Sequence, residues 1–322
     1  MSLFLPVMVV LASMPPGSSI RCVHAELCPD SAEEGLSLVQ LRGGEHLRGK
    51  QRAVLLSQIP IPGKRKVPPV HGQVSAKDAK KLGQASVIGS WANYYDAAEK
   101  DMQSQWTNFL LPMIRSSDFS SVLEVGAGAC RNTEKLLPFA QSLLATDIDP
   151  TAVRSCKHRF ASRKLPGKNL SFSVVDGVHL PVPDNSISLI YQFDSGVHFH
   201  REVIRRYLLE FQRVLRPGGT GFFHHSNLAA SQYPVEDDED ITRNYAWRSN
   251  MSRALFNQYA EEAGLEVLCH PLVDWVAGSK LDSFARFRKP GAEAHAKALD
   301  ADICPSHLHW KNNGGVVLKF KR

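Results

Sequence analysis

The sequence predicts an α/β fold: a doubly wound, mostly parallel sheet of seven strands that follows a disordered amino-terminal extension. From residue 85 onward, short apolar runs of strand length alternate with longer runs whose apolar residues recur every three to four positions. Such alternation is typical of parallel strands joined by helical crossovers. A glycine-containing loop directly follows the first apolar run, and this is where open α/β sheets bind ligands. Hydrophobic residues form 43% of the chain and charged residues 22%, as in soluble globular proteins.

Residues 1–25 have two interpretations. The first 20 residues carry no charge, and Leu3 to Ala12 form an apolar run that suits a secretory signal and is too short to span a bilayer. No basic residue precedes the run, however, and Pro15-Pro16 interrupt it early. The segment is therefore a signal or targeting sequence, which implies the secretory pathway or an organelle, or else a disordered or membrane-grazing tail, in which case the protein is cytoplasmic. No stable membrane span is expected.

Residues 26–84 are interpreted as a disordered linker rich in proline, glycine and basic residues. Residues 1–84 hold 11 Lys and Arg against 6 Asp and Glu, whereas the rest of the chain holds 27 against 26. Because the basic excess is confined to this tail, the following domain has no electrostatic signature of nucleic-acid binding.

The predicted domain spans residues 85–290 and begins with a helix over residues 85–115. The clearest later helix spans 201–215 and ends at the turn-forming run Arg216-Pro217-Gly218-Gly219. A further helix is predicted over 252–263. The predicted strands lie at 121–125, 142–147, 170–176, 187–193, 220–225, within 265–275, and at 281–288. Residues 291–322 form a carboxy-terminal extension, in which 314–322 predict an edge strand.

The first strand ends at Val125 and leads into a loop that contains Gly126 and Gly128. Residues without Cβ atoms let the backbone turn tightly, and the N–H groups at the next helix start can hold a polar ligand. Asp147 ends the second strand, 19 residues after Gly128, where a carboxylate accepts hydrogen bonds from ribose hydroxyls. Asp149 precedes Pro150 and is predicted to cap a helix. Asp176 ends the third strand and either accepts from an adenine amino group or forms a turn.

Four segments in this order resemble the successive motifs of class I S-adenosylmethionine-dependent methyltransferases with a type 11-like domain. They are LEVGAGACRNT, ATDIDP, VVDGVHLPVPDNSISLIY and FQRVLRPGGTGFF. The resemblance covers roughly residues 85–290 and implies a Rossmann-like methyltransferase fold with S-adenosylmethionine as cofactor. It also accommodates Cys130 in place of a third glycine, because this cofactor has no pyrophosphate.

The resemblance implies a set of residues that contact the cofactor. Three would line the methionine side: Glu124, Gly126 and Gly128. Asp147 would hold the ribose and Asp176 the adenine amino group. Two apolar residues, Ile148 and Val178, would contact the adenine ring, and Phe193 and Asp194 would lie near the methyl sulfonium.

Methyl transfer to oxygen or nitrogen profits from a base that titrates near neutral pH, which favours histidine. Histidines follow the fourth and fifth strands, and they are interpreted as hydrogen-bonding groups, as a general base, or as metal ligands. No metal site is assigned, because no carboxylate lies at a familiar ligand spacing. The favoured catalytic residues are His225 and then Asp194. The His-His-Ser-Asn run that begins at His224 also resembles a segment of sugar and small-molecule methyltransferases that faces the acceptor.

The sequence therefore predicts a methyltransferase that acts on an oxygen or nitrogen of a small-molecule, sugar-like acceptor. The alternatives are a nicotinamide-dependent oxidoreductase, disfavoured by Glu124 and Cys130, and a non-catalytic module that binds S-adenosylmethionine. Residues 228–244 are too long for a simple connection and form either a lid or a solvated acidic loop. The six cysteines show no disulfide framework in their spacing. The acceptor and the oligomeric state are not specified.

Overall fold

A computed structural model describes residues 92–236, 241–275, 278–291, 302–310 and 316–319 of the chain. For residues 92–97 and 242 it describes the backbone alone. All of the described residues belong to one compact unit. The predicted segments 1–25 and 26–84 lie outside the described residues, as do residues 85–91 of the first predicted helix.

One half of the sheet is parallel and has the spatial order β5-β4-β1-β2-β3. The chain runs outward from β1 to β3 and then returns to place β4 on the other side of β1, so strand order reverses between β1 and β4. A reversal of this kind opens a ligand-binding crevice at the carboxyl ends of the strands. The central strands are apolar and buried on both faces, as parallel strands between helices must be. The five strands are β1 (Ser121–Val125), β2 (Ser142–Asp147), β3 (Asn169–Val174), β4 (Ile187–Gln192) and β5 (Leu215–Ser226).

The other half of the sheet is mixed, and the described residues form a sheet of ten strands rather than the predicted seven. β8 (Asp282–Arg288) runs antiparallel to β5 and pairs along its far edge with both β6 (Glu266–Cys269) and β7 (Leu272–Asp274). Beyond β7 lie β9 (His307–Trp310), which is parallel to β7, and β10 (Val316–Lys319), which is antiparallel to β9. The predicted edge strand over 314–322 corresponds to β10, and β9 was not predicted.

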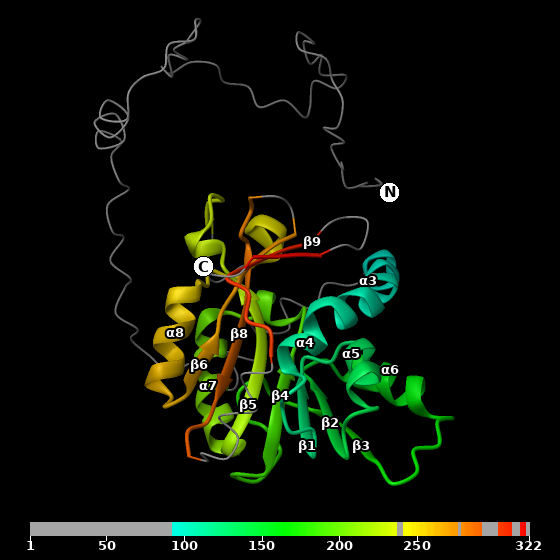
Figure 1. Cartoon of the computed structure of the whole chain (residues 1–322). Helices are drawn as coiled ribbons and strands as arrows, with labels where there is room; N and C mark the ends of the chain where they lie inside the picture. The colour runs from blue at the N-terminus through cyan, green and yellow to red at the C-terminus, as the bar shows by residue number, and fades with distance from the viewer. Residues whose placement is uncertain (1–91, 237–240, 276–277, 292–301, 311–315, 320–322) are drawn as a thin grey trace, which may run out of the picture. The chain divides into compact units, whose positions relative to one another are not determined.

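Helices cover both faces of the sheet (Figure 1). On one face the residues of α3 (Ala92–Gln105) and the π-helix η2 (Trp106–Leu110) join those of α4 (Leu111–Ile114), α5 (Arg131–Leu136) and α6 (Pro150–Phe160) in one hydrophobic core. On the other face α7 (Arg201–Val214) and α8 (Arg253–Glu262) contribute to a second core. This division matters for the site, because neighbouring residues of one strand face different cores.

The predicted strand and helix positions agree well with the structure in the parallel half, where β1 and β2 have the predicted bounds. Two predictions were wrong. The run Arg216-Pro217-Gly218-Gly219 does not separate α7 from its strand but lies within β5, where the Gly218 N–H donates to the carbonyl of Lys289 at 2.9 Å. The helix predicted over 85–115 is interrupted within its described part by the π-helical turn. Such turns change the facing of side chains within a helix.

Within the part of the chain that the structure describes, two disulfides join cysteines whose spacing gave no sign of pairing. Cys130 pairs with Cys156, and Cys269 pairs with Cys304. The second bridge ties β6 to the carboxy-terminal extension. Asp302 of the extension accepts a 2.8 Å hydrogen bond from the Ser116 N–H and forms an ion pair with buried Arg286 of β8. The described residues of the extension are therefore bonded to the predicted domain. No helix in the described ranges is long and apolar enough to cross a bilayer.

Candidate active site

The loop between β1 and α5 has a positive φ at every second residue from 126 to 130. Gly126, Gly128 and Cys130 have φ values of 67°, 55° and 62°. A Cβ atom at Gly126 would lie 2.2 Å from the hydroxyl oxygen of Ser195, so no larger residue fits there without movement. Cys130 adopts this strained conformation without being glycine, and its side chain is held in the disulfide with Cys156 of α6. The loop is therefore fixed at both ends.

Asp147 closes the loop from the neighbouring strand. Its Oδ2 accepts a 2.8 Å hydrogen bond from the Gly128 N–H, and its Oδ1 accepts a 2.9 Å hydrogen bond from the Asp149 N–H. Burial raises the pKa of Asp147, and these backbone hydrogen bonds oppose the rise. Asp149 caps α6 as predicted, because its side chain accepts from the Thr151 N–H at 2.8 Å. The predicted cap is therefore confirmed, and the role of Asp147 toward a ribose stays a prediction.

Glu124 lies beneath the loop and is 2% exposed. Its Oε2 accepts a 2.5 Å hydrogen bond from the Thr133 hydroxyl of α5. Burial raises the pKa of Glu124 to about 8, although the Thr133 hydrogen bond and the nearby Arg131 oppose the shift. The carboxyl is therefore largely neutral at pH 7 and would be ionised by a positive group placed beside it. Its chemistry fits the positive methionine portion of a sulfonium nucleoside.

The ends of β2 and β3 lie side by side, since the Val175 N–H donates to the carbonyl of Asp147 at 2.9 Å. Asp176 follows β3 and accepts hydrogen bonds of 2.8 Å from the N–H groups of Val178 and His179. Burial raises the pKa of Asp176, but its hydrogen bonds with His179 outweigh this and lower the pKa below its usual value. The turn predicted at this aspartate is present. Val178 is buried and Ile148 is half-buried.

The end of β4 is tied to the glycine loop and to α5. Asp194 has φ 74°, and its Oδ2 lies 2.8 Å from Nη2 of Arg131, the first residue of α5. The next residue, Ser195, donates from its hydroxyl to the Gly126 carbonyl at 3.0 Å and accepts from Nε2 of Gln192 at 2.7 Å. Asp194 and the loop therefore lie at the same edge of the sheet, as predicted.

Phe193 is a buried core side chain at this edge. It is 4% exposed, its ring stacks on that of His224 with centroids 5.1 Å apart, and it makes edge contacts with Phe109 and Phe284. Its proximity to a bound methyl group remains a prediction.

His225 lies on the face of β5 opposite to that of His224 and is 0% exposed. Its ring stacks on Phe256 of α8, with centroids 4.5 Å apart. Nδ1 is 2.8 Å from the Ser226 carbonyl, which can only accept, so Nδ1 carries the proton; Nε2 lies 2.7 Å from Nε2 of His270. Burial lowers the pKa of His225 to about 3. Its role as a base stays a prediction, but this geometry weighs against it, because the basic nitrogen faces another imidazole.

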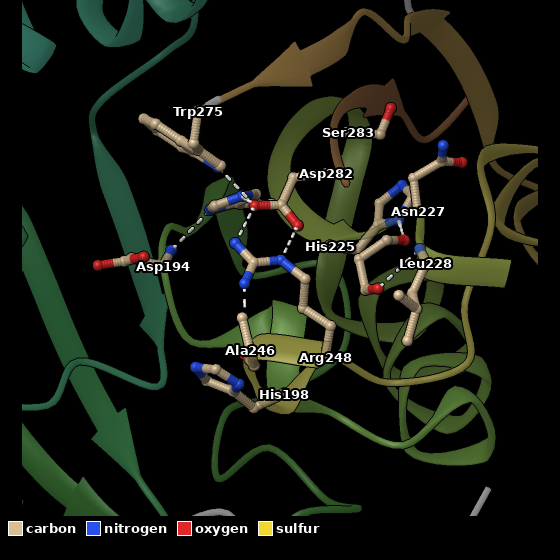
Figure 2. A network of polar contacts seen from close by, with 12 residues as sticks. Asp194, His198, His225, Asn227, Leu228, Ala246, Arg248, Trp275, Asp282 and Ser283 are labelled. Atoms are coloured by element: carbon tan, nitrogen blue, oxygen red, sulfur yellow. Dashed lines mark hydrogen bonds and ion pairs between the residues drawn. The ribbon is translucent and has the colours of Figure 1, made fainter. Parts of the chain in front are cut away.

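The rest of the His-Ser-Asn run also makes hydrogen bonds within the protein. The Ser226 hydroxyl donates to the Ser249 carbonyl at 2.7 Å, and Nδ2 of Asn227 donates to the Lys280 carbonyl at 2.9 Å. Figure 2 shows Asn227 and Leu228 on the same side as His225, away from Asp194. These hydrogen bonds connect the end of β5 to the segment that follows it and to the segment between β7 and β8.

A buried polar cluster lies at the same edge of the sheet, on the face of β5 that carries His224. It is centred on Asp282 at the start of β8 (Figure 2). This residue is 0% exposed, and its oxygens accept hydrogen bonds from Nε and Nη2 of Arg248 at 2.6 and 2.7 Å and from Nε1 of Trp275 at 2.5 Å. Nε2 of His224 lies 3.2 Å from Oδ2, the longest of these contacts. Despite burial, Arg248 and His224 hold the pKa of Asp282 far below its usual value. Within the described ranges, no group of three or more His, Cys, Asp or Glu is arranged to hold a metal ion.

Backbone strain gathers at this edge as well. The described residues include six that have positive φ without being glycine, and only Asn185 lies at the other end of the sheet. The five at this edge are Cys130, Asp194, Ala246, Trp247 and Lys280. Strain of this kind is common at functional sites, where the surrounding structure maintains it.

Sequence reasoning missed Asp282 and Trp275. The available signal was the acid itself: in the predicted strand 281–288, Asp282 shares a strand face with Phe284, so an acid lies on a face expected to be buried.

The fold and the site together define a class: an open α/β sheet whose glycine loop and strand-end acids suit a nucleoside cofactor. Residues 122–219 match the family model described as a methyltransferase domain. The chain therefore carries a class I S-adenosylmethionine-dependent methyltransferase domain, and S-adenosylmethionine is the cofactor of that class.

Two curated relatives match parts of the chain. The 2-methyl-6-phytyl-1,4-hydroquinone methyltransferase of Synechocystis sp. is 24% identical over 145 residues, which are 45% of this chain and 41% of the relative. The phthiotriol/phenolphthiotriol dimycocerosates methyltransferase of Mycobacterium tuberculosis is 35% identical over 114 residues, which are 33% of this chain and 37% of the relative. The chain thus spans less than half the length of these relatives.

Solved structures with a similar fold include an S-adenosylmethionine-dependent methyltransferase from Clostridium acetobutylicum. It is 15% identical and has a TM-score of 0.48, covering 62% of this chain and 99% of that one. The N-methyltransferase NodS from Bradyrhizobium japonicum is 19% identical with a TM-score of 0.45, covering 60% of this chain and 98% of that one.

Proposed function

We propose that this protein transfers the methyl group of S-adenosylmethionine to an oxygen or nitrogen atom of a small-molecule acceptor. The observation that carries the proposal is the contact between Asp147 and the loop. A strand-end carboxylate 2.8 Å from the Gly128 N–H, at the point where strand order reverses, lies where a nucleoside ribose would bind.

The cofactor supplies an activated methyl group on a positively charged sulfur, and the protein supplies position and electrostatics. In this proposal Glu124 balances the positive charge of the methionine portion while Gly126 and Gly128 allow it to approach the backbone. Asp147 orients the ribose. Adenine lies at the ends of β2 and β3, where it contacts Ile148, Asp176 and Val178, and Phe193 borders the methyl group.

Asp194 is the group proposed to meet the acceptor. It ends β4 beside the loop, and its side chain is 24% exposed, whereas His225 is buried against α8. A carboxylate in this place can orient an acceptor hydroxyl or amine and accept its proton as the carbon–oxygen or carbon–nitrogen bond forms. The two curated relatives are named for a hydroquinone and a triol, which favours a hydroxyl acceptor.

The test uses methyl-labelled S-adenosylmethionine with an extract of small metabolites, followed by identification of the labelled products. We expect label in a small molecule and a strongly reduced rate for Asp194→Asn, with cofactor binding retained. If S-adenosylhomocysteine binds but no product is labelled in any extract, a non-catalytic binding module becomes the better account. Binding of a nicotinamide cofactor in its place would favour an oxidoreductase.

A further inference from the structure

Asp194 is held in an unfavourable backbone conformation by contacts on both sides. Its φ of 74° lies in the left-handed region, which residues with a Cβ atom avoid. Its backbone N–H donates to Nδ1 of His224 at 3.1 Å, and its carboxylate forms an ion pair with Arg131 at 2.8 Å. One contact comes from the buried interior and the other from the helix that follows the glycine loop.

The contact with His224 defines the protonation of that imidazole. A backbone N–H can only donate, so Nδ1 of His224 must accept and carries no proton. The proton of the neutral ring is then on Nε2, which lies 3.2 Å from Oδ2 of Asp282. With one nitrogen bonded to Asp194, the other already protonated and the ring 1% exposed, His224 is not arranged to take a proton from an acceptor.

Asp282 lies beside this imidazole, with 3.2 Å between His224 Nε2 and Asp282 Oδ2, and it draws together three separate parts of the chain. Arg248 comes from the segment between β5 and α8, Trp275 follows β7, and Asp282 itself begins β8. The carboxylate is fully buried and receives hydrogen bonds on both oxygens. A buried charge with this many donors is rigidly placed, since any shift would leave one of them unpaired.

We propose that Asp282 and His224 are positioning residues, which fix the backbone of Asp194 so that its carboxylate faces the acceptor beside the glycine loop. The inference rests on the proposed function and names the parts that orient its acceptor-side group. The order of contacts is Asp282, His224, the Asp194 N–H, the Asp194 carboxylate and Arg131. Reacting groups tolerate little displacement, and an error of about 1 Å costs roughly 10²-fold in rate.

Two substitutions of His224 separate positioning from general damage. The amide oxygen of His224→Asn would lie near the place of Nδ1 and can accept from the Asp194 N–H. The longer His224→Gln places its amide near Nε2 and removes the acceptor that His224 provides for the Asp194 N–H. Both remove the ring and leave similar cavities, so their loss of stability should be similar.

Two measurements are made on the full chain: the rate of label transfer to the metabolite extract and hydrogen exchange at the Asp194 amide. We expect His224→Gln to lower the rate roughly 10²-fold and to expose the Asp194 amide to exchange, while His224→Asn retains the rate and the protection of the amide. Equal rates and equal exchange in the two His224 variants would overturn the inference. If the wild-type protein transfers no label, the proposed function fails, and the exchange pattern alone then decides whether His224 positions Asp194.

Discussion

The carboxylate of Asp147 lies 2.8 Å from the backbone nitrogen of Gly128, so the end of β2 is hydrogen-bonded to the loop that follows β1. This contact links two residues that are 19 positions apart and joins them at the edge where strand order reverses. The loop and the acid therefore form one hydrogen-bonded unit, and loss of either is expected to weaken cofactor binding.

Asp147→Ala should weaken the binding of S-adenosylhomocysteine by at least tenfold, because a hydrogen bond to a charged group contributes about 1.5–3 kcal/mol. Isothermal titration calorimetry measures the effect. Asp149→Ala is the matched control: it removes the α6 cap bonded to the Thr151 N–H and should cost about 1 kcal/mol of stability while leaving affinity unchanged. Equal loss of affinity in both variants would contradict the separate roles of the two acids.

Gly126→Ala should destabilise the protein more than Gly167→Ala. The two glycines have nearly the same backbone, with φ of 67° and 69°, so each alanine costs about 1–2 kcal/mol of conformational strain. Only at Gly126 would the new Cβ atom meet Ser195, at 2.2 Å, whereas nothing lies within 4 Å at Gly167. Chemical denaturation measures the difference. Similar unfolding free energies for the two variants would show that the loop adapts to the clash.

Glu124 should make the unfolding free energy of the cofactor-free protein depend on pH. Its pKa is raised from 4.5 to about 8 in the folded protein, so the folded state binds this proton more tightly than the unfolded state. The contribution to stability is present in full below about pH 4.5 and is lost as the pH rises toward about 8. Burial of Asp147 acts in the same direction. Glu124→Gln should flatten the profile, and an unchanged profile would count against a buried, protonated Glu124.

Removal of the two disulfides should have different effects on binding. The bridges span 26 and 35 residues, so the loop-closure entropy lost with each differs by less than about 0.5 kcal/mol. Replacing both cysteines of either pair by serine should cost about 2–4 kcal/mol. Only loss of the Cys130–Cys156 bridge should weaken the binding of S-adenosylhomocysteine, because that bridge anchors the glycine loop to α6. Equal affinity in the two double variants would contradict this anchoring role.

The sequence predicted the parallel half of the fold best, for a physical reason. Strands such as β1 are mostly apolar because helices cover both faces, and the glycine loop and the Asp149-Pro150 cap mark the turns clearly. The edge strand β9 consists of His307-Leu308-His309-Trp310, which is short and half polar, and it forms because β7 offers a partner. Its pairing depends on contacts far along the chain.

Local sequence predicted that the glycine loop and Asp147 lie at one edge of the sheet, where a hydrogen bond joins them; their roles toward the cofactor stay predictions. Local sequence did not show which neighbours a side chain meets on its face of a strand. His224 and His225 are neighbours in sequence, yet one approaches Asp194 and the other stacks on α8. Asp282 receives its partners from segments that converge only in the folded chain, so neither its burial nor its link to Asp194 could be read from spacing.

The most direct test of the account is a crystal structure of the full chain grown with S-adenosylhomocysteine. We expect the ligand to lie across the carboxyl ends of β1 and β2, with its ribose hydroxyls on Asp147, its adenine beside Asp176 and its amino acid portion near Glu124. Density for the ligand at another place, or a vacant loop at saturating concentration, would contradict the assignment of this edge as the cofactor site.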